Sequence, residues 1–272
     1  MNSEGCDGCP AHQQMAKMGV DIANCDHVVA LAGNPNTGKS SVFNALTGLR
    51  QHVGNWTGKT VTRAEGAFGY RGERYKLVDL PGTYSLLSAS QDEEISRNFL
   101  LFGQPDCTVV VVDATALERN LNLVLQVLEI TDRAVVCVNL MDEADRKGME
   151  VDVRSLSRDL GVPAVPTVAR NKQGLAELVA SVAAVVSGET KTSPLRVEPP
   201  AHVREAINGL VPLIEDMAPG LPSARWVALR LLDGDHKVRE ALLSGEIAGL
   251  ADQQRRPAPL DPSRVRAIAG AQ

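Results

Sequence analysis

Eight residues from Gly33 to Ser40, GNPNTGKS, fit the pattern GxxxxGK[ST] of loops that bind polyphosphates. In such loops the backbone N–H groups turn inward, the lysine ammonium reaches the β- and γ-phosphates, and the final hydroxyl binds Mg²⁺. Lys39 and Ser40 are the candidates for these two roles. With the residue that follows, the predicted phosphate-binding set is Gly33, Asn34, Pro35, Asn36, Thr37, Gly38, Lys39, Ser40 and Ser41.

The segments on either side supply the elements that such a loop needs. Residues 27–32, HVVALA, are apolar and β-branched like a buried parallel strand, and residues 40–49 place Val42, Phe43 and Leu46 at helical spacing. The start of that helix would add its positive end to the phosphate site. A glycine-rich turn that binds nothing is the alternative, and this order of strand, loop and helix argues against it.

A second acidic group for the magnesium side is predicted at Asp79, in the sequence DLPG after the strand-like residues 75–78. Gly82, at the end of this motif, can present its N–H to the γ-phosphate. Residues 145–148, DRKG, also match DxxG, but they follow no strand directly and are interpreted as a chance match.

The choice of base is predicted at Asn139 and Asp142, in the sequence NLMD at the end of the strand-like residues 133–139. A carboxylate there can accept from N1–H and from the 2-amino group of guanine, a pair that adenine does not offer. These residues therefore indicate a guanine nucleotide. The alternative is an ordinary helix cap, in which Asp142 binds backbone amides only.

Composition narrows the class of protein. The chain has 272 residues, 44% of them hydrophobic, which is enough for a full α/β core and a smaller second unit. A net charge of −5 without a long basic block gives no support for a nucleic-acid partner. No apolar run approaches the ~18 residues that span a bilayer and no secretory signal is present, so we expect this chain to be soluble and cytoplasmic.

The five cysteines do not suggest a disulfide framework. Cys107 and Cys137 lie in apolar strand-like runs and are predicted core residues. Cys6, Cys9 and His12 fall within seven residues, CDGCPAH, a spacing that could hold a soft metal, although a mobile tail without a metal is the simpler interpretation.

Strands alternating with helices predict the fold. Residues 61–70 and 74–79 are expected to form an antiparallel hairpin after an irregular stretch at 50–59. The expected strands that follow are 107–113, 133–139 and 162–168, and the expected helices are 117–130, 152–160 and 175–186. This order predicts an α/β, doubly wound, mostly parallel sheet with ligands at the carboxyl ends of its strands.

Four regions are predicted along the chain. Residues 1–26 would be a flexible N-terminal tail, 27–187 a GTP-binding domain, and 188–200 a proline-bearing linker. Residues 201–272 show helical spacing, which predicts a helical domain and C-terminal tail, with prolines and glycines dividing it into short helices.

These motifs together resemble the translation-factor-like GTPases, and more closely the ferrous iron transport protein B (FeoB) family. The phrases RQHVGNWTGKTVTRAEG, DLPGTYSL and VVDATALERNL, at residues 50–66, 79–86 and 111–121, carry the resemblance. The resemblance implies a Ras-like P-loop G domain and an all-helical domain that stabilises bound GDP (GDI-like). It also implies GTP, GDP and Mg²⁺ as ligands, and a transmembrane Fe²⁺ transporter of which this chain is the N-terminal, cytoplasmic part.

The resemblance further implies roles for single residues. Thr60 matches the switch threonine that completes Mg²⁺ coordination, with Thr57 and Thr62 as competitors. Val168 and Ala169 fall where the family has a Ser-Ala pair whose backbone N–H meets guanine O6. Catalysis would then involve Lys39, Thr60 and Gly82, and Mg²⁺ would be held through Ser40, Thr60 and Asp79.

Two expectations concern the rate of hydrolysis. Thr83 stands where many regulatory GTPases carry the glutamine that orients water, so slow intrinsic hydrolysis is expected. Asn36 can turn its side-chain oxygen toward the phosphates, where K⁺ could bridge it to the nucleotide, as the resemblance implies for some members. The alternative is that Asn36 only braces the turn.

The sequence is compatible with two alternative functions. One is a soluble GTPase in ribosome or tRNA maturation, and the other is a nucleotide-gated binding module whose hydrolysis is incidental. The sequence leaves open whether the chain forms homo-oligomers.

Overall fold

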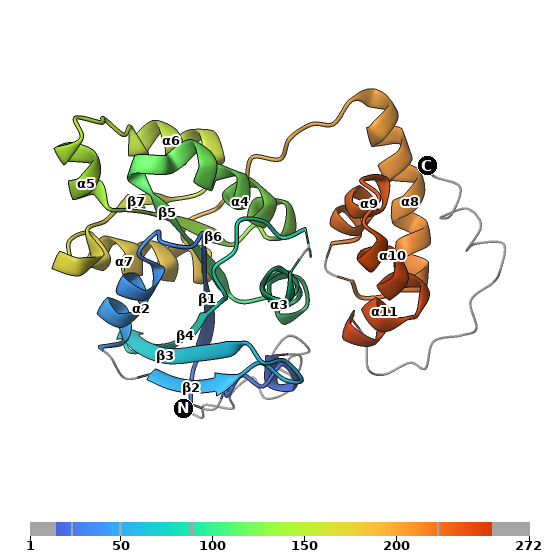
Figure 1. Ribbon diagram of the computed structural model, residues 1–272, viewed down its shortest axis with the longest axis horizontal. Coiled ribbons are helices and arrows are strands. Elements are labelled where there is room, and N and C mark those ends of the chain that lie inside the picture. The colour runs from blue at the N-terminus through green and yellow to red at the C-terminus, as the bar shows by residue number, and fades with distance from the viewer. Residues whose placement is uncertain (1–14, 23, 49–50, 88–89, 222, 252–272) are drawn as a thin grey trace. The chain divides into compact units, whose positions relative to one another are not determined.

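The computed structural model describes residues 15–22, 24–48, 51–87, 90–221 and 223–251, and these form two compact units divided after Arg196 (Figure 1). Cys6, Cys9 and His12 lie outside the described residues. Within the described residues no group of three or more His, Cys, Asp or Glu side chains is arranged to hold a metal ion. None of the helices among them is long and apolar enough to cross a membrane.

A seven-stranded sheet, in the order β2-β3-β4-β1-β5-β6-β7, forms the centre of the first unit. Its strands are β1 (His27–Gly33), β2 (Gln51–Asn55), β3 (Thr62–Tyr70), β4 (Glu73–Asp79), β5 (Cys107–Asp113), β6 (Ala134–Asn139) and β7 (Ala164–Pro166). β1 pairs in parallel with β4 and β5, while β3 pairs antiparallel with β2 and β4. The predicted doubly wound, mostly parallel α/β fold and its hairpin are therefore confirmed.

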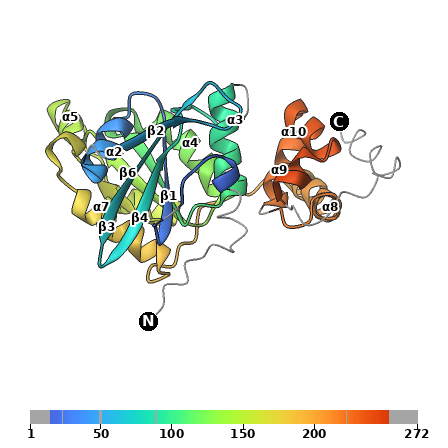
Figure 2. The ribbon, with the colours of Figure 1, turned by 90° about the horizontal axis from the view of Figure 1, so that it is seen from below.

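Helices cover both faces of this sheet (Figure 1, Figure 2). The helices of the first unit are α2 (Lys39–Thr47), α3 (Gln91–Asn98), α4 (Leu117–Ile130), α5 (Met141–Arg146), α6 (Val153–Leu160) and α7 (Leu175–Val186). Val42 and Phe43 of α2 and Leu178 of α7 pack against one face of the sheet. α3 and α4 lie on the other face. Cys107 and Cys137 are fully buried, as predicted.

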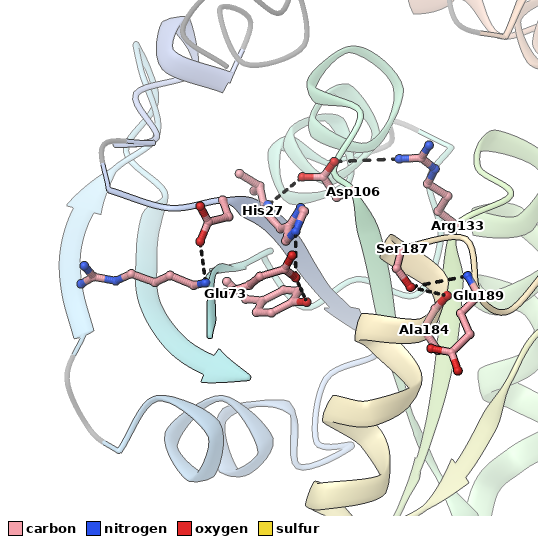
Figure 3. A network of polar contacts seen from close by, with 11 residues as sticks. His27, Glu73, Asp106, Arg133, Ala184, Ser187 and Glu189 are labelled. Atoms are coloured by element: carbon pink, nitrogen blue, oxygen red, sulfur yellow. Dashed lines mark hydrogen bonds and ion pairs between the residues drawn. The ribbon is translucent and has the colours of Figure 1, made fainter. Parts of the chain in front are cut away.

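Polar contacts hold the amino ends of the strands, opposite the predicted site (Figure 3). The N–H of Val28 donates to Asp106 at 2.8 Å, and Glu73 accepts from the hydroxyl of Tyr75 at 2.8 Å and lies 3.2 Å from His27. These contacts join β1, β4 and the start of β5. The carboxyl ends of the same strands are left to position the loops of the site.

Two sequence predictions for the sheet were wrong in extent. Residues 50–59 were expected to be irregular, but β2 pairs with β3 along the edge of the sheet, with Asn55 opposite Thr62. Its exposed His52 and Val53 and its glycine hide the alternation that marks a strand. The strand predicted at 162–168 is limited to the three residues of β7, because Val168 turns away to bridge with Gln173.

The described part of the predicted N-terminal tail packs on the first unit. Met15 and Val20 are buried, and the guanidinium of Arg63 donates to the backbone oxygens of Met18 and Gly19. Arg63 is itself buried and paired with Glu65 at 2.6 Å. Residues 15–22 therefore add to the domain that was predicted to begin at residue 27.

The second unit is helical among its described residues. It contains α8 (Ala201–Met217), α9 (Ala224–Leu232), α10 (His236–Leu243) and α11 (Glu246–Ala251). The prediction that prolines divide it into short helices was wrong at Pro212, which lies inside the 17-residue helix α8. Ile207 and Ile214, one on each side of Pro212, are buried, and the packing of α8 on α9 holds the helix together across the proline.

Candidate guanine-nucleotide site

The phosphate loop connects β1 to α2, as the sequence predicts. Thr37 is buried, and its hydroxyl donates to the backbone oxygen of Asn34 at 2.9 Å, which closes the loop on itself. Gly38 has a φ of 78°, and a Cβ added there would collide with the side chain of Asn139. Only glycine satisfies both the left-handed backbone and the close approach. Gly33 is the last residue of β1, and the remaining predicted residues, Asn34, Pro35, Asn36, Ser40 and Ser41, lie in this loop or in the first turn of α2.

Lys39 brings the phosphate loop to the end of β4. Its ammonium pairs with the carboxylate of Asp79 and donates to the backbone oxygen of Leu80 at 2.7 Å. Burial raises the pKa of the Asp79 carboxyl above its usual range, and the nearby ammonium opposes that shift. Because an ammonium has three N–H donors, Lys39 can exchange one of these partners for a phosphate oxygen.

The segment after Asp79 lies against the phosphate loop. The N–H of Thr83 donates to the backbone oxygen of Gly33 at 3.3 Å, and a Cβ added at Gly82 would lie 3.6 Å from Pro35. That distance is an ordinary contact, so crowding in this conformation does not require glycine at position 82. The buried hydroxyl of Thr83 donates to the backbone oxygen of Ser85 at 2.5 Å and is used within its own loop.

Asn139 joins the phosphate loop to the loop after β7. Its side-chain Nδ2 donates to the backbone oxygen of Thr37 at 3.0 Å, and its Oδ1 accepts from the N–H of Ala169 at 3.1 Å and from the hydroxyl of Thr167 at 3.2 Å. The residue is only 1% exposed. A buried amide with its donor and acceptor both satisfied fixes the spacing of the two loops.

Asp142 lies in the first turn of α5, which starts directly after β6 because Leu140 takes a left-handed φ of 63°. Its Oδ1 is buried and has no hydrogen-bond partner among the described residues. Its Oδ2 pairs with the guanidinium of Arg170 and lies 3.5 Å from that of Arg146. The alternative interpretation, in which Asp142 caps the helix through backbone amides, has no such bond among the described residues. An unpaired, buried carboxylate oxygen costs free energy unless a donor arrives.

The loop at Val168 and Ala169 has its N–H groups engaged within the protein. Ala169 donates to Asn139, as described above, and Val168 donates to the backbone oxygen of Gln173 at 3.1 Å. Both residues are buried. A contact from Ala169 to guanine O6 therefore requires its N–H to leave Asn139, and this contact remains a prediction.

The residues predicted to hold magnesium are more exposed to solvent than those predicted to bind the base. Ser40 and Thr60 are exposed, and no hydrogen bond of either side chain is recorded within the described part of the chain. Lys59, next to Thr60, pairs with Glu94 of α3 at 3.0 Å. Among the described residues, no hydrogen bond joins Thr60 to Ser40 or Asp79, so the shared magnesium site stays a prediction. Asn36 is also exposed, with a φ of 67° that suits asparagine.

Comparison with known proteins places these loops in a family. A family model described as ferrous iron transport protein B matches residues 27–182, and a model of the FeoB cytosolic helical domain matches residues 200–258. The chain belongs to the ferrous iron transport protein B family. The family predicted from the sequence motifs is confirmed.

Curated FeoB relatives are much longer than this chain. The Fe(2+) transporter FeoB of Escherichia coli (strain K12) is 38% identical over 213 residues, which is 76% of this chain and 27% of that protein. A Porphyromonas gingivalis fusion of Fe(2+) transport protein A and the Fe(2+) transporter FeoB is 39% identical over 226 residues, 80% of this chain and 27% of that protein. The chain thus spans 27% of the length of these relatives.

Solved FeoB structures match both units. The cytosolic domain of T. maritima FeoB in its apo form has a TM-score of 0.72 and 34% identity, and covers 90% of this chain and 92% of that one. An S. thermophilus NFeoB mutant bound to GDP has a TM-score of 0.75 and 32% identity, and covers 90% and 87%. These matches confirm a G domain followed by a helical domain, and they do not favour a GTPase of ribosome or tRNA maturation.

Sequence reasoning did not identify Arg146 and Arg170 as partners of Asp142. Arg170 directly follows the predicted base loop, which was the available signal. A pairing between residues 28 positions apart depends on the fold, because β6 and β7 must first lie side by side.

Proposed function

We propose that this chain binds GTP and GDP with Mg²⁺, hydrolyses GTP slowly, and acts as the cytoplasmic regulatory part of a bacterial Fe²⁺ transporter at the inner membrane. The observation that carries the proposal is the set of contacts around Asn139. Asn139 connects the phosphate loop, through Thr37, to the loop at Val168 and Ala169, and it lies three residues before Asp142, whose Oδ1 is buried and unpaired among the described residues.

The residues at the phosphate end fit a magnesium nucleotide. Ser40 and Asp79 offer the hydroxyl and carboxylate oxygens that Mg²⁺ prefers, and Asp79 is the more buried of the two. When bound, the ion would neutralise charge on the phosphates. Lys39 would then exchange its contact with Asp79 or Leu80 for a phosphate oxygen, and the N–H of Gly82 would meet the γ-phosphate.

Slow hydrolysis follows from what the loop after Asp79 lacks. Thr83 uses its hydroxyl for Ser85, so neither its length nor its orientation suits it to place the attacking water. Backbone groups near Thr60, or a partner, would have to place that water. The membrane part implied by the longer relatives would receive the nucleotide-dependent change.

The test of the proposal is an exchange of base specificity at Asp142. Asp142→Asn should weaken GDP binding by about 100-fold and strengthen binding of xanthosine diphosphate, because the new amide donates to the oxygen that xanthine carries in place of the amino group. Affinities would be measured by competition against a fluorescent nucleotide. Asp145→Asn, an exposed aspartate on the same helix, is the matched control and should change neither. Unchanged GDP affinity in Asp142→Asn would contradict the proposal.

A further inference from the structure

The two oxygens of the Asp142 carboxylate lie in different environments. Oδ1 is buried without a hydrogen-bond partner among the described residues, whereas Oδ2 pairs with Arg170 and lies at the limiting distance of 3.5 Å from Arg146. Arg170 therefore makes the closer of the two ion pairs. One of the two carboxylate oxygens therefore has a protein partner before any ligand binds.

Guanine requires both of these oxygens. Its N1–H and its 2-amino group are two parallel donors, and full recognition places one on each carboxylate oxygen. Oδ1 has no protein donor to give up, but protein atoms cover it, so guanine reaches it only after those atoms move. Oδ2 already accepts from Arg170, so a guanine donor has to share this oxygen with the guanidinium, and each contact weakens the other.

Arg170 lies close to the residues of the predicted base site. It lies in the short 3₁₀ turn η3 (Ala169–Asn171), directly after the residue whose N–H donates to Asn139. Its side chain is 52% exposed, and Asp142 is the one acceptor recorded for it among the described residues. The guanidinium can therefore swing into solvent when a ligand displaces it, at the small cost of an exposed ion pair.

We propose that Arg170 is a positioning residue that competes with guanine for Asp142 and thereby speeds the release of guanine nucleotides. This inference rests on the proposed function of the site. Arg170 closes the ion pair as the base leaves, which stabilises the empty site relative to the occupied one. The residue thus weakens affinity without touching the phosphates.

Release of a fluorescent GDP from the full chain, measured by stopped flow, tests the inference. Arg170→Ala should slow release by about two- to fivefold, the range expected for a half-exposed ion pair. Arg170→Lys keeps the charge but loses the planar guanidinium, so its release rate should lie between those of the unmodified chain and Arg170→Ala. Arg158→Ala removes an exposed arginine on α6 that pairs with Asp159 and should leave release unchanged.

A double-mutant cycle separates competition at Asp142 from a general structural effect. In the Asp142→Asn background, with fluorescent xanthosine diphosphate as ligand, Arg170→Ala should have little effect because the ion pair is already absent. Raising the ionic strength should reduce the difference between the unmodified chain and Arg170→Ala. A purely structural role of Arg170 would persist in both measurements and would overturn the inference.

The outcomes also distinguish this inference from the proposed function. If the unmodified chain binds no guanine nucleotide, the proposed function itself is wrong. If it binds GDP and Arg170→Ala releases GDP at an unchanged or faster rate, the function stands and the competition by Arg170 is refuted.

Discussion

The candidate site has a base end, around Asn139 and Asp142, and a predicted magnesium end, around Ser40 and Thr60. The two differ in how many hydrogen bonds the protein already makes there. At the base end, Asn139 is buried with three hydrogen bonds, and Asp142 and Ala169 already have protein partners. At the magnesium end, Ser40 and Thr60 are exposed, and their side chains have no recorded hydrogen bonds within the described residues.

This difference separates two kinds of ligand binding. A nucleotide base that binds at the base end replaces hydrogen bonds that its protein partners already make. The positions of these partners are therefore set in advance, and the free energies of the empty and the occupied site differ little. We expect a magnesium-bound phosphate to draw Thr60 into place only with GTP, because only GTP carries the γ-phosphate that this segment would contact. The base end should therefore control affinity and specificity, and the magnesium end should control turnover.

The largest effect should come from breaking the base end at its centre. Asn139→Ala removes the bonds to Thr37, Thr167 and Ala169 together, and we expect GDP affinity to fall by about 100-fold, as for two or more lost buried hydrogen bonds. Isothermal titration calorimetry with GDP would measure this loss.

Asn120→Ala is the control for that loss. Asn120 is a buried asparagine too, 3% exposed, but its side chain holds Asp113 and Ala116 at the start of α4. Its removal should lower the melting temperature and leave GDP affinity unchanged. Equal losses of affinity in both variants would mean that Asn139 acts only through folding stability.

The next effect concerns the magnesium end, where Asn36 is exposed on the phosphate loop. If K⁺ bridges Asn36 to the nucleotide, turnover should be about 30-fold faster in K⁺ than in Na⁺, because a cation there stabilises the charge that develops during transfer. Asn36→Ala should remove the difference while GDP affinity changes little. Equal rates in both salts for the unmodified chain would exclude the cation from the mechanism.

A smaller effect is expected from the second unit. If the helical domain stabilises bound GDP, a chain ending at Pro200 should release GDP about tenfold faster, in the range of ordinary coupling between domains. A solved G domain of T. maritima FeoB, which covers 58% of this chain, indicates that the truncated chain can fold. Identical release rates for the full and the truncated chain would refute a regulatory role for the second unit.

The smallest effect should follow from Thr83→Ala. Because the hydroxyl of Thr83 bonds to Ser85, its loss should change single-turnover hydrolysis by less than about fivefold, the equivalent of one ordinary hydrogen bond. A much larger fall in the hydrolysis rate would show that Thr83 acts in catalysis. The magnesium end would then be closer to its catalytic conformation than we infer.

The sequence predicts most of the fold because its strong elements are locally encoded. β5 and α4 have the predicted bounds, since a run of valines in a central strand and leucines at helical spacing need no information from elsewhere in the chain. β2 escaped prediction because it is an exposed edge strand, held by pairing with β3 rather than by its own pattern.

The site divides in the same way. Lys39, Asp79, Asn139 and Asp142 are found from motifs, because each stands at the end of a predicted strand or at a fixed position after it. Their contacts depend on which strands are neighbours. The bond from Asn139 to Thr37 joins residues 102 positions apart, and the Arg170–Asp142 pair requires β6 and β7 to be adjacent.

Phosphate release by the unmodified chain, with GTP and with ATP, tests the central claim most directly. We expect release from GTP in the presence of Mg²⁺ and none above background from ATP, because Asp142 finds no pair of donors on adenine. Lys39→Ala, purified in parallel, should abolish the release and exclude a contaminating enzyme. Equal release from both nucleotides, or unchanged release in Lys39→Ala, would contradict the account.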